Sequence, residues 1–200
     1  MDLRINEPDA GYLLEELLET LGIRRLMFNN HSQSAILDHR HAEIVNNNKA
    51  LARWNRIKND AIAEGLQALL SDCSIIEFAD WAAVNDASGF WDRLYCDVIK
   101  PLNRRDFQFI FHIGDTTKKL VFEVDEILDI MGDYSSYGTV TLVLHEDEAD
   151  KLLNRLNVQN ARGSISEKYR FLFNTIRIDV LLILQDNHTT STITEAAQKL

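Results

Sequence analysis

The segment "FQFIFHI", residues 107–113, carries the clearest strand pattern in this chain of 200 residues. Phe107, Phe109 and Phe111 alternate with other residues at a period of two, so a strand would place all three rings on one face. Aromatic and β-branched side chains also favour extended backbone. The segment therefore predicts a strand with one strongly apolar face.

The residues that follow can be interpreted in two ways. "KLVFEV", residues 119–124, could pair back as a hairpin strand, or it could belong to a helix that begins near Thr116 with Thr116 or Asp115 as its cap and ends at Gly132. We favour the helix, because its apolar residues recur at helical spacing. These residues are Leu120, Val124, Ile127, Leu128 and Met131.

Beyond this helix, "GTVTLVL" (residues 138–144) predicts a second strand, and "HEDEADKLLNRLN" (residues 145–157) predicts a helix with acids in its first turn. The resulting β-α-β-α order allows a right-handed crossover between parallel strands. We expect the two strands and the first helix to share one core. Its predicted members are Phe107, Phe109, Phe111, Val124, Leu128, Val140, Leu142 and Leu144.

The rest of the chain predicts an α+β protein with a helical N-terminal half, a small mixed α/β sheet region and a C-terminal helix. Residues 1–105 form the predominantly helical region and residues 106–200 the α/β region, within one compact domain. The expected N-terminal helices cover residues 9–22, 32–45, 49–70, 75–84 and 88–99. The fourth of these rests on a capping-box pattern at Ser74 and Glu77, and the fifth should stop before Pro101. The expected C-terminal elements are a helix at 166–174, a strand at 176–184 and a helix at 191–200.

Charge is concentrated in one segment. Nine of the chain's 31 acids lie between Glu123 and Asp150 without a lysine or arginine, which leaves 22 acids against 21 bases elsewhere and places nearly all of the net charge of −10 here. Like charges on one helix face repel each other, and interspersed lysines usually relieve the repulsion. The segment is either a solubilising surface or a binding face for a basic partner.

The sequence predicts the residues of this binding face. They are Glu123, Glu126, Asp129, Asp133, Glu146, Asp147 and Glu148. We expect a non-enzymatic cytoplasmic interaction protein that binds a basic macromolecule: an adaptor, an immunity-type inhibitor or a nucleic-acid mimic. A second copy of the protein, presenting Lys49, Arg53 and Arg56, is one candidate partner.

An enzymatic alternative remains open. His112 and His145 close the two predicted strands, and ligands in α/β folds bind at the carboxyl edge of the sheet. Together with Asp115 they could perform acid–base chemistry in a small hydrolase or transferase.

Other classes of function have less support in the sequence. His39, His41 and Glu43 leave a zinc shell incomplete, so no metal or cofactor is expected. Phosphate-binding and nucleophile motifs are absent, and the negative charge argues against direct nucleic-acid binding. Cys73 and Cys96 are expected to be buried free thiols, and no segment is apolar enough to suggest membrane insertion.

Overall fold

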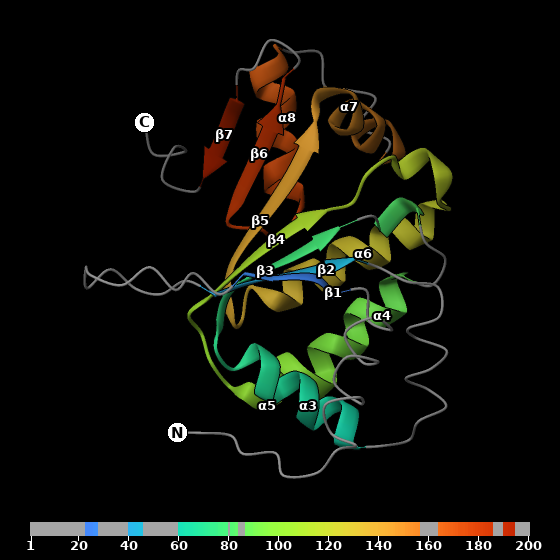
Figure 1. Ribbon diagram of the computed structural model, residues 1–200. Coiled ribbons are helices and arrows are strands. Elements are labelled where there is room, and N and C mark those ends of the chain that lie inside the picture. Colours follow the sequence, from blue (N-terminus) through green and yellow to red (C-terminus); the bar gives the residue numbers. More distant parts are fainter. Residues whose placement is uncertain are drawn as a thin grey trace, which may run out of the picture.

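The computed structural model describes residues 23–27, 40–45, 60–79, 81–83, 87–156, 164–185 and 190–194 (Figure 1). These residues form one seven-stranded sheet whose spatial order follows the chain order. The strands are β1 (Ile23–Met27), β2 (Arg40–Val45), β3 (Cys73–Ala79), β4 (Phe107–His112), β5 (Gly138–His145), β6 (Val180–Leu184) and β7 (Thr190–Thr194). Strands β2 to β6 run parallel to one another, whereas β1 pairs antiparallel with β2 and β7 pairs antiparallel with β6 at the two edges.

The described helices connect these strands. They are α3 (Asp60–Leu70), α4 (Ala87–Leu94), α5 (Lys100–Leu102), α6 (Val121–Tyr134), α7 (Glu146–Arg155) and α8 (Ile165–Thr175). Short 3-10 turns lie at Trp81–Ala83 and Thr116–Lys118. Helices combined with a largely parallel sheet confirm a mixed α/β architecture.

The strand order places the described helices on one face of the sheet. Crossovers between parallel strands are right-handed in about 98% of cases, so strands added in one direction bring their connecting helices to the same side. Figure 1 shows the helices gathered on one side of the sheet. Burial along β4 agrees, because Phe107, Phe109 and Phe111 are buried while Gln108 is exposed and Ile110 is half-buried.

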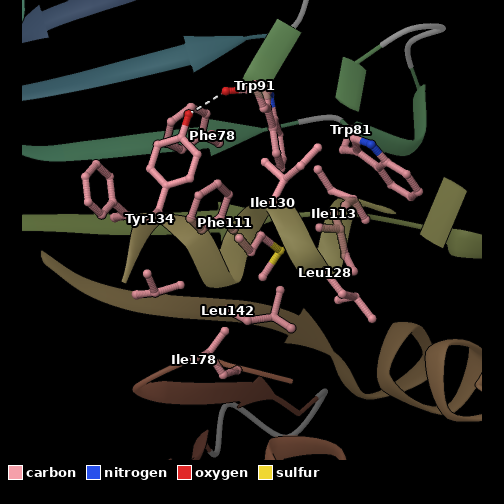
Figure 2. Close-up of a cluster of buried hydrophobic side chains, with 14 of the residues drawn as sticks. Phe78, Trp81, Trp91, Phe111, Ile113, Leu128, Ile130, Tyr134, Leu142 and Ile178 are labelled. Atoms are coloured by element: carbon pink, nitrogen blue, oxygen red, sulfur yellow. Dashed lines mark hydrogen bonds between the residues drawn. The ribbon is translucent and has the colours of Figure 1, made fainter. Parts of the chain in front are cut away.

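Aromatic side chains form the centre of the core between β3, β4, α4 and α6 (Figure 2). The rings of Phe78 and Phe111 stack with centroids 4.6 Å apart. Tyr134 of α6 meets Phe78 and Phe111 edge-on at 5.3 Å, and its hydroxyl donates a 2.7 Å hydrogen bond to the Trp91 carbonyl oxygen. All eight predicted core residues are buried, which confirms that part of the sequence analysis.

Two strands replace helices that were predicted in the N-terminal half. Residues 73–79 form β3 and residues 40–45 form β2, so the helix assignments there are wrong. Ile76 lies opposite Phe109 and Phe78 opposite Phe111, and this packing against β4 outweighs the capping-box signal at Ser74. Of the other predicted N-terminal helices, α3 confirms the end of the third, while the helix at 9–22 lies outside the described residues.

The fifth predicted helix is present but does not stop before Pro101. Helix α4 continues through a wide π-helical turn, Tyr95–Ile99, into α5, which contains this proline. Proline has no N–H to donate to the carbonyl four residues earlier, that of Asp97. The Gln67 side chain of α3 donates to this Asp97 oxygen instead, at 2.8 Å. A donor from another helix thus compensates for the missing backbone bond.

The predicted helix that begins at Thr116 is two elements. Asp115 caps a 3-10 turn at Thr116–Lys118 by accepting from the Thr117 N–H, as the sequence predicted for a cap. Leu120 is then extended, with φ −74° and ψ 156°, and α6 begins only at Val121.

At the C-terminal end, α8 confirms the helix predicted at 166–174, and β6 confirms the second part of the predicted strand. The predicted helix at 191–200 is wrong where the structure describes it, because residues 190–194 form β7. Edge pairing with β6 accounts for this, since Ile193 lies opposite the buried Leu181.

We predict that β4 has one essential and one tolerant face. Phe111→Ala should reduce the free energy of unfolding by about 3–5 kcal/mol, because its buried ring contacts three other aromatic rings. Gln108→Ala, on the exposed side of the same strand, should change it by less than about 0.5 kcal/mol. Urea denaturation followed by circular dichroism compares the two variants, and equal losses would contradict this orientation of β4.

Candidate functional site

The seven acids of the predicted binding face lie on two helices that both begin at the carboxyl edge of the sheet. Helix α6 follows β4 through the 3-10 turn, and α7 follows β5 directly. Glu123, Glu126, Asp129 and Asp133 belong to α6, while Glu146, Asp147 and Glu148 form the first turn of α7.

Four of these acids form bonds within the fold: Glu123, Glu146, Asp147 and Glu148. Glu123 accepts the Leu120 N–H at 2.7 Å, and Glu148 accepts the His145 N–H at 2.9 Å, so each caps its own helix. Asp147 pairs with Lys151 one turn later, at 3.0 Å. Such bonds satisfy N-terminal amides and complement the helix dipole. These acids therefore have a structural role that requires no binding partner.

Glu146 has an internal partner as well. The Tyr169 hydroxyl of α8 donates to its carboxylate at 3.4 Å. Burial, and then the nearby charges of Glu146 and Asp150, raise the pKa of Tyr169 to about 12. The tyrosine therefore keeps its proton at neutral pH and remains a donor that joins α8 to the start of α7.

The other three acids, Glu126, Asp129 and Asp133, form an exposed row that we call the acidic stripe. They follow one another at steps of three and four residues along α6, so they lie on one face of the helix. Among the described residues, no side-chain hydrogen bond or ion pair engages them. The opposite face of α6 is buried in the core through Val124, Ile127 and Met131.

No ion pair between described side chains neutralises the acidic stripe. Helix α6 contains no lysine or arginine. Arg177, which lies between α8 and β6, packs its aliphatic part against Gly132, where an added Cβ would come within 3.1 Å of the arginine Cβ. None of the ion pairs between described side chains joins Arg177 to the stripe.

An apolar feature at the start of α6 was not predicted from the sequence. Leu120, Val121 and Phe122 are 60%, 47% and 65% exposed. Leu120 was expected on the buried face, but it precedes the helix in an extended conformation and so does not follow the helical period. A sequence pattern does not locate the start of a helix to within two or three residues, so it could not show that α6 begins only at Val121.

His112 and His145 end the adjacent parallel strands β4 and β5, and Asp115 follows β4. The side-chain contacts of His112 and Asp115 are with other residues. His112 Nε2 lies 2.8 Å from Glu77 Oε1 on β3. Asp115 accepts from Thr117 and from Lys151 Nζ, the latter at 3.1 Å. His145 is exposed at the start of α7. Lys151 thus bonds Asp115 to α7, and none of the described hydrogen bonds of Asp115 involves a histidine.

Asp115 is the most strongly perturbed carboxyl in this region. Hydrogen bonds from the Thr117 side chain and backbone, and then from Lys151, lower its pKa from 3.8 to about 2. Since Lys151 also bonds Asp147, this lysine connects the 3-10 turn to the first turn of α7. The arrangement is typical of a structural ion pair at the edge of the sheet.

Several residues that were considered as metal ligands or as a partner-binding surface lie outside the described part of the chain. Lys49, Arg53, Arg56 and His39 lie outside the described residues, and so do the side chains on β2. Across the part of the chain that the structure describes, no group of three or more His, Cys, Asp or Glu side chains could hold a metal ion. Of the two cysteines, Cys73 is buried as predicted, whereas Cys96 is exposed, so that part of the thiol prediction is wrong.

We predict that Asp115 contributes to acid stability. A carboxyl whose pKa falls on folding stabilises the protein above its unfolded pKa, here 3.8, and this contribution is lost as the pH falls through about 2. Asp115→Asn should therefore be less stable than wild type at pH 6, and the difference should shrink between pH 4 and pH 2. Urea midpoints measured across this range test the sign.

Asp129→Asn is the matched control, because it neutralises an exposed carboxylate without a side-chain partner in the described structure. Its difference from wild type should stay small throughout. A difference between wild type and Asp115→Asn that remains constant down to pH 2 would contradict the role of the Asp115 charge.

Two features thus distinguish this site: the acidic stripe on α6, and the exposed apolar residues Leu120, Val121 and Phe122 at the start of the helix. No described helix is long and apolar enough to cross a membrane. Comparison of the chain with protein-family models, curated proteins and solved structures finds no match.

Proposed function

We propose that this is a non-enzymatic interaction protein that binds a basic macromolecular partner through the acidic stripe on α6. The proposal includes a cytoplasmic location and leaves three kinds of role: adaptor, immunity-type inhibitor or nucleic-acid mimic. A second copy of the protein is one candidate partner, and a basic protein of another kind is the other.

The observation that carries the proposal is a difference among the seven acids of the predicted binding face. Glu123, Glu146, Asp147 and Glu148 are bonded within the fold, whereas Glu126, Asp129 and Asp133 are exposed and form no bond among the described side chains. Three like charges on one helix face repel each other. A partner with lysines or arginines at matching positions would relieve this repulsion and gain association rate from the complementary charge.

The acidic stripe does not hold the fold together. Exposed charges contribute about 0–1 kcal/mol each to stability, and the core face of α6 is independent of them. Substitution of the stripe should therefore separate binding from folding.

The enzymatic alternative ranks second. The hydrolase or transferase proposal needs His112, Asp115 and His145 to act together, and the observation in its favour is that β4 and β5 are adjacent and parallel. However, His112 contacts Glu77 and Asp115 pairs with Lys151. These contacts favour structural roles for both residues over catalysis.

We predict that reversing two charges of the stripe weakens association but not the fold. Glu126→Lys combined with Asp129→Lys should lose its partner in a pull-down from native lysate, and wild type should lose the same partner at high salt. The reason is electrostatic screening, since the Debye length falls from about 10 Å at 0.1 M salt to about 3 Å at 1 M. The urea midpoint of the double variant should stay close to that of wild type.

A matched control reverses two exposed carboxylates outside the acidic stripe, so its net charge changes by the same amount. Glu64 on α3 and Asp150 on α7 are both exposed, so Glu64→Lys with Asp150→Lys alters net charge without touching the stripe. This control should retain the partner at low salt. If the same partners survive both high salt and reversal of the stripe, the acidic surface is only a solubility device.

A further inference from the structure

Three consecutive apolar residues are exposed where α6 begins. Among the described residues, four large hydrophobic side chains are exposed, and three of them are the consecutive Leu120, Val121 and Phe122. Single exposed apolar residues are common on protein surfaces, but adjacent ones form patches that frequently mark binding sites. We call these three residues the apolar turn.

Phe122 lies in line with the acidic stripe. From Phe122 to Glu126, Asp129 and Asp133 the steps along α6 are four, three and four residues. These steps keep all four side chains on one face of the helix, with the ring at its N-terminal end. The exposed face of α6 is therefore divided along its length into an apolar end and an anionic remainder.

We infer that the partner presents a basic amphipathic helix to this face of α6, with lysines or arginines along the acidic stripe and apolar side chains over Phe122. The inference rests on the proposed function and adds the apolar half of the contact. Aromatic side chains, phenylalanine included, are enriched at the centres of protein interfaces, where they bury large contact areas. An anionic membrane surface fits less well, since the carboxylates beside Phe122 would repel it.

The two parts of the surface should act on different rate constants. Exposed carboxylates steer a basic partner and raise the association rate, which salt suppresses. A buried ring retains the partner and lowers the dissociation rate, which salt changes little. Phe122 thus determines the lifetime of a complex whose formation depends on Glu126 and Asp129.

Two synthetic helical peptides of equal charge separate these effects. Both carry lysines on one face; one has leucines on the adjoining face and the other has alanines in their place. Affinities and rate constants are measured by surface plasmon resonance on the full chain for wild type, Phe122→Ala and the Glu126→Lys, Asp129→Lys variant. Phe171→Ala is the matched control, because Phe171 is 46% exposed but lies on α8.

Wild type should bind the leucine peptide at least about tenfold more tightly than the alanine peptide, through slower dissociation. Phe122→Ala should remove this advantage, and Phe171→Ala should retain it. An advantage that persists in Phe122→Ala, or an equal affinity of wild type for both peptides, would overturn the inference. Binding of anionic vesicles that depends on Phe122, without peptide binding, would overturn it in favour of a membrane surface.

The charge-reversed variant distinguishes failure of the inference from failure of the proposed function. If reversal abolishes binding of both peptides while Phe122→Ala has no effect, the acidic stripe binds basic partners and only the anchor is wrong. If reversal leaves both affinities unchanged, the proposed function fails and the inference fails with it. Circular dichroism of each variant confirms that the fold is retained.

Discussion

Burial of the phenylalanine face of β4 against α6 is the interaction on which the rest of the described structure depends. Phe109 and Phe111 both meet Tyr134 of α6 edge-on, and Tyr134 in turn bonds the Trp91 carbonyl on α4. A sheet, a crossover helix and a second helix thus share one set of aromatic contacts. Because the core side of α6 is determined by these contacts, its solvent side is determined too, and that side is the acidic stripe.

The strand order gives the acids at the carboxyl edge their separate roles. Parallel strands joined by same-handed crossovers bring the first turns of α6 and α7 to the same edge of the sheet. Acids in those first turns meet unpaired amides and positive dipole ends, so Glu123 and Glu148 have a local explanation. Acids farther along α6 have none. One acidic segment therefore combines a structural function with a surface that is open to a partner.

Much of the second half of the fold could be predicted from the sequence. The period of two in β4 and the helical period of α6 are strong, because each element has one apolar and one polar face. Strand β3 was missed, since the short apolar run Ile75–Ile76 before Glu77 suits either structure and its burial opposite Phe109 and Phe111 comes from residues more than thirty positions away. The exposed apolar turn was missed because it depends on where α6 begins.

By itself the sequence determined the concentration of charge between Glu123 and Asp150, the alternation of β4 and the amphipathic division of α6, all of which follow from local spacing. Tertiary structure alone decided that Asp115 and Glu146 are bonded inside the fold, because their partners Lys151 and Tyr169 lie 36 and 23 positions away in the sequence. It also decided that β3 is a strand and that Phe122 is exposed in line with the stripe. These outcomes depend on contacts between distant segments, whose free energies outweigh local backbone preferences.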